Sequence, residues 1–69
     1  SIQTTTQLGT CGHALLEEAA HHNWHINLIK RTHALSHRYK LSQEETNHLL
    51  SSLPPAIEYM KTATQSAKQ

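Results

Sequence analysis

The sequence lacks aspartate and phenylalanine altogether, and its 69 residues include one cysteine, two glycines and two prolines. Because Cys11 is alone, the chain can form neither an internal disulfide nor a cysteine-based zinc motif. A glycine-rich phosphate loop, a GxSxG motif and an HExxH motif are also missing, and these are common signatures of catalytic sites. We therefore expect a protein that is not an enzyme and that has no cofactor.

Long apolar runs are missing as well. No stretch approaches the roughly 18 apolar residues that a transmembrane helix needs, and no signal-peptide pattern is visible. Six Lys and Arg against five Glu give a formal net charge of +1, which is too balanced to indicate a membrane or nucleic-acid partner. We expect a cytoplasmic protein. Since the chain does not begin with Met, a processed secreted or periplasmic form stays an alternative.

The length allows one small helical domain, spanning residues 1–69. A domain of this size buries only about 60% of the surface of its unfolded chain. With 36% hydrophobic residues, it can support two or three helices around a thin core. Both ends are polar, and we expect residues 1–9 and 65–69 to fray.

The segment from Leu8 to Tyr39 has no proline and, after Gly12, no glycine. Its apolar residues recur at steps of three and four, which predicts one long helix with two opposite stripes. The first stripe consists of Leu8, Cys11, Leu15, Ala19, His22, Ile26, Ile29 and His33. The second consists of Leu16, Ala20, Trp24, Leu28 and Leu35, with Tyr39 near its edge.

After the long helix, the segment Ser42-Gln-Glu-Glu45 has the spacing of a capping box. It predicts a second helix from Gln43 to about Leu53. Pro54-Pro55 is expected to stop that helix, and Pro55 to begin a third segment that ends near Ala63. The predicted fold class is all-α: a long helix folded against a shorter, proline-broken return arm, in a helical hairpin or a three-helix arrangement.

A return arm this short can cover the first stripe of the long helix but not easily the second. We therefore predict that the second stripe, centred on Trp24, docks onto another protein chain, in a hetero-complex or a homodimer. Tryptophan is enriched in binding hot spots, and an amphipathic helix in a groove is a common recognition mode. The function class is a small chaperone, adaptor or inhibitor. The assigned partner-binding residues are Leu16, Ala20, Trp24, Leu28, Arg31, Leu35 and Tyr39.

The seven histidines support an alternative function, a histidine-based metal-binding or pH-sensing protein. Histidines spaced i, i+4 on a helix can chelate zinc, copper or nickel. The candidate ligands are His21, His25, His33 and His37. Two histidines of the first stripe, His22 and His33, are candidates for pH-sensitive packing positions. Our expectation is that the protein has no specific metal site.

A second alternative is a small nucleic-acid-binding regulator. The segments Lys30-Arg31 and His37-Arg38-Tyr39-Lys40 could contact phosphate groups. Their basic residues are spread around the predicted helix instead of lining one side, so we expect no nucleic-acid partner. The capping box and the proline pair occur in many unrelated helical chains, and no residue pattern names a family.

Overall fold

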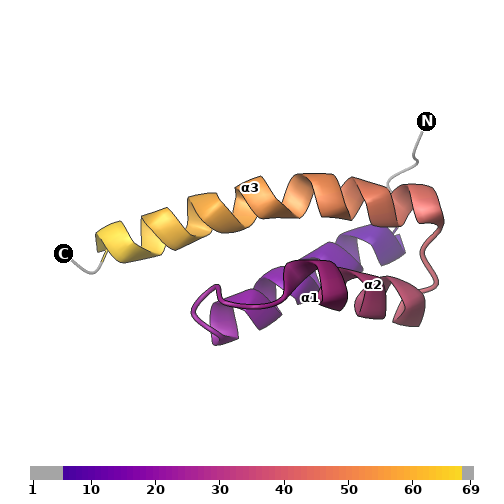
Figure 1. Ribbon diagram of the computed structural model, residues 1–69, viewed down its shortest axis with the longest axis horizontal. Helices are drawn as coiled ribbons and strands as arrows, with labels where there is room; N and C mark the ends of the chain where they lie inside the picture. Colours follow the sequence, from indigo (N-terminus) through magenta and orange to yellow (C-terminus); the bar gives the residue numbers. More distant parts are fainter. Residues whose placement is uncertain (1–5, 68–69) are drawn as a thin grey trace.

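The computed structural model describes residues 6–67 and contains three helices. They are α1 (Thr6–His21), α2 (Leu28–Arg38) and α3 (Gln43–Ala67). Helices α1 and α2 lie on the same side of α3, and every pair of helices is in contact (Figure 1). The described residues form no strand. The prediction of an all-α fold in a hairpin or three-helix arrangement is confirmed.

The predicted continuous helix from Leu8 to Tyr39 is wrong, because residues 22–27 form a turn. Helix α1 ends in a Schellman-type cap. The Trp24 N–H donates to the Ala19 carbonyl oxygen at 2.6 Å, and the Asn23 N–H donates to the Ala20 carbonyl oxygen at 3.2 Å. This cap holds Asn23 at φ 55° and Trp24 at φ 67°, in the left-handed region. Asparagine enters that region more readily than most residues other than glycine, and it redirects the chain here.

The second helix begins and ends with local hydrogen bonds of its own. The Asn27 side chain caps α2 by accepting a hydrogen bond from the Lys30 N–H at 3.2 Å. At the other end, the Leu41 N–H donates to the Ser36 carbonyl oxygen at 2.9 Å, and Lys40 lies at φ 58°. This is a second Schellman-type cap. The predicted end of the helical segment near Tyr39 is therefore correct, although the helix that ends there is a short one.

The capping box at the start of α3 is confirmed. The Glu45 N–H donates to Ser42 Oγ at 3.1 Å, and the Ser42 N–H donates to Glu45 Oε1 at 2.8 Å. The predicted break at Pro54-Pro55 is wrong, because α3 continues through both prolines. Each proline removes one backbone donor, but both are exposed, while Leu53 and Ile57 are buried on either side of them. This core packing holds the helix together.

The predicted order of lengths, a long first helix and a shorter return arm, is consequently wrong. Helix α3 has 25 residues, against 16 in α1 and 11 in α2, so the return arm is the longest helix. The ends are also more helical than expected, since residues 6–9 belong to α1 and residues 65–67 to α3. The remaining residues expected to fray, 1–5 and 68–69, lie outside the described residues. None of the described helices is both long and apolar enough to cross a membrane.

The core lies between α1 and α3 and is closed by α2. The buried apolar residues are Leu8, Cys11, Leu15, Ala19, Leu35, Leu49, Leu53 and Ile57. The residues of the first predicted stripe are therefore buried along α1 but not beyond it. The turn changes the direction of the chain, so that α2 buries a different set of its side chains. Ile29 is 67% exposed, and His22 and His33 are exposed too. Neither histidine is a buried packing position, so the predicted pH-sensitive packing is wrong.

Helix α2 contributes few apolar side chains to this core. Leu35 is its only fully buried apolar residue among those described, and it lies between two buried hydroxyl residues, Thr32 and Ser36. The Thr32 and Ser36 hydroxyls have no hydrogen-bond partner. Buried polar groups without partners are destabilising. The two unpaired hydroxyls thus reduce the stability that the packing of α2 contributes.

Candidate functional sites at the helix corner and between α1 and α3

The predicted partner-binding residues do not form one face of the molecule. Leu35 is 5% exposed and belongs to the core, and Leu16, Leu28 and Tyr39 are half-buried around it. Ala20 is exposed on α1. The turn at residues 22–27 separates the α1 part of the stripe from the α2 part. The idea of a single continuous docking stripe is therefore wrong.

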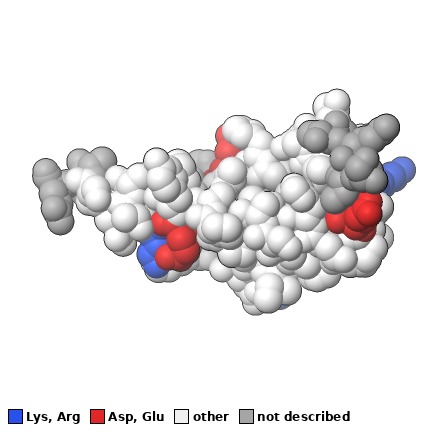
Figure 2. Space-filling model, turned by 90° about the horizontal axis from the view of Figure 1, so that it is seen from above, with Lys and Arg blue, Asp and Glu red and all other residues white. Residues whose placement is uncertain are grey.

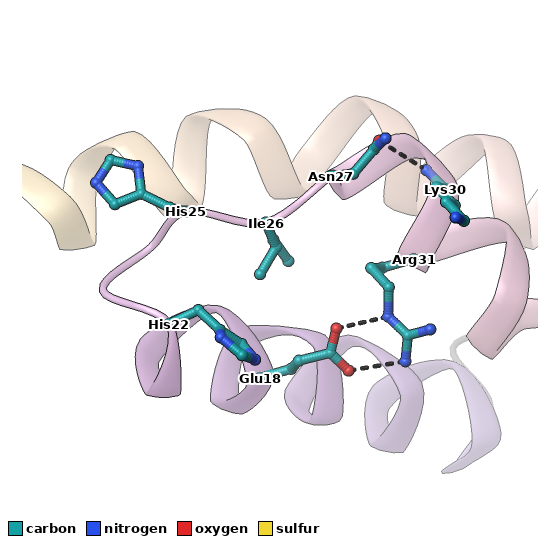
Figure 3. A pocket seen from close by; sticks show the side chains of 7 residues that line it. All are labelled: Glu18, His22, His25, Ile26, Asn27, Lys30 and Arg31. Carbon is teal, nitrogen blue, oxygen red and sulfur yellow. Dashed lines mark hydrogen bonds and ion pairs between the residues drawn. The ribbon is translucent and has the colours of Figure 1, made fainter.

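The remaining two predicted residues lie near the α1–α2 corner. Trp24 is half-buried in the turn, where it lines a small cavity of about 120 Å³ together with residues of the last part of α3. Arg31 lines a larger hollow of about 560 Å³, which we call the corner hollow (Figure 3). Its lining residues are Glu18, His22, His25, Ile26, Asn27, Lys30 and Arg31.

A bidentate ion pair crosses the corner hollow. Arg31 Nε donates to Glu18 Oε2 at 2.6 Å, and Arg31 Nη2 donates to Glu18 Oε1 at 2.9 Å (Figure 3). The hydrogen bonds from Arg31 hold the pKa of Glu18 below its usual value. Both side chains are part-buried, and the two residues are 13 positions apart in sequence. The pair therefore fastens the start of α2 to the last turns of α1.

The described histidines do not converge on a metal site. His21, His25, His33 and His37 are all exposed, and His13 Nε2 lies 3.5 Å from Glu17 Oε1, with both side chains exposed. Within residues 6–67, no three or more histidine, cysteine or acidic side chains come together in a group that could hold a metal ion. The turn that replaces the predicted helix carries His25 away from the position that the i, i+4 spacing had given it.

The thiol of Cys11 is fully buried in the core. Burial raises its pKa above the ordinary value of a cysteine. A thiol of this kind is a poor nucleophile, because the reactive form is the thiolate. Cys11 therefore acts as a small apolar core residue in the folded state.

A second hollow, a groove, lies between α1 and α3. It shares no lining residue with the corner hollow. It has a volume of about 380 Å³ and is lined by Leu8, Gly9, Gly12, His13, Leu16, His48, Leu49 and Leu53. We call it the leucine groove. Its lining contains no lysine, arginine or acidic residue.

The α1 wall of the leucine groove contains both glycines of the chain. A Cβ placed at Gly12 would lie 3.4 Å from Leu49 Cδ2, an ordinary van der Waals contact. A Cβ placed at Gly9 would have no atom of the described residues within 4 Å outside its own stretch of helix, so the groove has space there. The sequence alone does not predict this site, because the groove forms only where α1 lies beside α3.

Charged residues are also sparse on the outer side of α3. Figure 2 looks down on this side of the molecule and shows a surface that is mostly uncharged, with lysine and arginine only near its edges. On α2, by contrast, no acidic residue is present, and Lys30, His33, His37 and Arg38 are exposed.

Comparison with known proteins gives no relative: no family model, no curated protein and no solved structure matches this chain. An ion pair within the chain crosses the corner hollow, whereas the lining of the leucine groove is mainly apolar.

Proposed function

We propose that this chain is a non-enzymatic protein-binding module that holds an apolar helix of a partner protein in the leucine groove. The supporting observation is the groove itself, which is lined by four leucines and two glycines and has no charged Lys, Arg or Glu side chain. Helix-in-groove binding uses such surfaces, with affinity supplied by apolar side chains of the bound helix.

Gly9 supports the proposal because no packing contact among residues 6–67 requires a glycine there. A glycine inside a helix costs about 1 kcal/mol relative to alanine, and a Cβ at position 9 would meet no atom of the described residues within 4 Å outside its own stretch of helix. Glycine permits the close approach of another backbone or ligand. A partner helix that crosses α1 at Gly9 makes use of the space that this residue leaves.

The dimensions of the groove limit the partner segment. From Leu8 to Leu16, the α1 wall is about 12 Å long at about 1.5 Å per residue, which corresponds to roughly two helical turns. A partner helix would therefore insert two or three apolar side chains, spaced i, i+3 or i+4, and i+7. Leu16 is the one residue of the predicted docking stripe that keeps this role.

The module would serve as a small chaperone, adaptor or inhibitor, in a hetero-complex or by self-association. To test the proposal, a photo-crosslinking amino acid is placed at position 48, an exposed residue of the groove lining on α3, and, as a control, at the exposed position 62 of the same helix. The crosslinked protein is then purified and its affinity for the chain measured by calorimetry.

The decisive variant is Gly9→Gln, which fills the groove without disturbing a contact of the fold. We expect it to weaken the measured affinity at least about tenfold, whereas the exposed control Thr62→Gln leaves affinity unchanged. If Gly9→Gln binds the partner as tightly as the wild type does, the leucine groove is not the docking site. If the crosslinker at position 48 captures nothing, the binding-module proposal loses its support.

A further inference from the structure

The turn between α1 and α2 holds two residues in a conformation that side chains rarely adopt. Asn23 and Trp24 both have positive φ angles, 55° and 67°. Left-handed geometry is unfavourable for residues other than glycine, and for a residue as bulky as tryptophan in particular. A straight helix through this segment would relieve both positions.

The amino-acid sequence is compatible with that straight helix. No glycine or proline occurs between His13 and Leu53. The apolar periodicity also continues through the turn, since Ala20, Trp24 and Leu28 follow at i, i+4 and i+8. Nothing in the sequence of residues 22–27 therefore excludes a helix that joins α1 to α2 in place of the observed turn.

We infer that the chain can form a domain-swapped dimer in which residues 6–38 of each copy make one straight helix. Helix α1 of each copy then packs against α2 and α3 of the other copy. The core contacts of Leu8 and Leu15 with Leu49 and Leu53 are formed again, now between the two chains. Exchange of an identical element conserves every contact except those of the hinge, which makes it a low-cost route to a dimer.

A second copy is the occupant that this geometry requires. As one helix, residues 6–38 would extend over about 50 Å at about 1.5 Å per residue, so α1 could no longer reach the α3 of its own chain. Glu18 and Arg31 are 13 positions apart and would be separated by about 20 Å along the straight helix. In the straight form, only a second copy can place an Arg31 beside Glu18 and offer α1 the buried sides of α2 and α3.

In this exchange α2 stays against the α3 of its own chain, so the contacts that have to open first are those of α1 with α2 and α3. The exchange is concentration-dependent, because dimers form by mass action.

Hinge variants test the inference in both directions. Asn23→Ala disfavours the left-handed turn and favours helix, so its dimerisation constant should exceed that of the wild type by at least about tenfold. Asn23→Gly favours the turn and should lower the constant by a similar factor. Sedimentation velocity over a wide concentration range measures both, and circular dichroism verifies that the variants are helical.

A charge-reversal pair distinguishes a swapped dimer from any other dimer. Glu18→Arg and Arg31→Glu each place like charges at the corner when a chain folds alone or pairs with itself. In a swapped dimer of the two variants, each α1 meets the opposite charge on the other copy. Mixing the two should therefore yield mainly the heterodimer, detected by native mass spectrometry.

Two results would overturn the inference. One is a helical Asn23→Ala protein that stays monomeric at the highest concentration reached. The other is a mixture of the charge-reversed chains with no preference for the heterodimer, which would mean that any dimer forms through an unswapped surface. If Asn23→Ala does not fold, the charge-reversed mixture and Asn23→Gly still decide the question.

Discussion

The Thr32 hydroxyl is buried in the core without a hydrogen-bond partner, and Thr32→Val should therefore stabilise the protein. Thr32 has no exposed surface, and its Oγ1 contacts no donor or acceptor within bonding distance. An unsatisfied buried polar group costs about 1–3 kcal/mol. Valine has nearly the same shape, and its helix propensity is similar to that of threonine. We expect the free energy of unfolding to rise by about 1–2 kcal/mol.

Thermal and urea denaturation followed by circular dichroism measure this change. For a domain of 60–100 residues, 1 kcal/mol corresponds to roughly 4–8 °C in Tm, so the expected shift is well above experimental error. The urea m-value should stay unchanged, because the surface exposed on unfolding is almost the same.

Thr46→Val is the matched control on α3. Thr46 is also buried, but its Oγ1 donates to the Ser42 carbonyl oxygen at 2.9 Å. Loss of a hydrogen bond of this kind costs about 0.5–1.5 kcal/mol, so this variant should be less stable than the wild type. The reasoning is refuted if Thr32→Val destabilises the protein as much as Thr46→Val does.

Three further predictions concern the groove wall, the corner and the histidines. Gly9→Ala should raise the unfolding free energy by about 0.5–1 kcal/mol, because the new Cβ meets no atom of another part of the described chain within 4 Å; a loss of stability in denaturation experiments would contradict this. The pKa of Glu18 is lower in the folded protein than in the unfolded chain, where a carboxyl pKa is about 4.3. The ion pair with Arg31 therefore stabilises the fold above about pH 4.3, and this stabilisation is lost as the pH falls through the pKa of Glu18 in the folded protein. The stability gap between wild type and Arg31→Gln, measured by urea denaturation, should therefore close between about pH 5 and pH 3, and a gap of constant size would argue against the pair. An approximately tenfold excess of zinc should stabilise the protein by less than about 1 kcal/mol, since no metal-binding group is found among residues 6–67; calorimetry that detects sub-micromolar binding would reverse this expectation.

Features that depend on a few neighbouring residues could be predicted from the sequence. The capping box of Ser42 and Glu45 is an example, because both of its hydrogen bonds join residues three positions apart. The core positions of α1 are another, since Leu8, Cys11, Leu15 and Ala19 follow the helical period and are all buried.

The turn after α1 was missed because the apolar period continues through it. Two asparagines mark the turn: Asn23 occupies the left-handed position after α1, and Asn27 caps α2. Asparagine is the usual substitute for glycine at the first of these positions and a good N-cap at the second. The two asparagines are thus a local signal for the turn, and it competes with the apolar period that favours a continuous helix.

The two hollows could not be predicted, because both depend on how the helices are placed relative to one another. In the straight helix that was expected, Glu18 and Arg31 would lie about 20 Å apart instead of forming an ion pair. The leucine groove likewise needs α1 to lie beside α3, with Gly12 close to Leu49. Local sequence patterns do not contain this information.

The reaction of Cys11 with an alkylating reagent can be used to measure how often the core of this protein opens. Its thiol has no exposed surface in the folded chain, and it is the single cysteine of the sequence. An alkylating reagent can reach it only in molecules whose core has opened. The labelling rate, divided by the rate in a fully unfolded chain, therefore equals the fraction of molecules in which α1 has separated from its neighbours. Because each molecule has one cysteine and reacts once, a molecule in which this helix has separated is recognised in a mass spectrum by the added mass of one label.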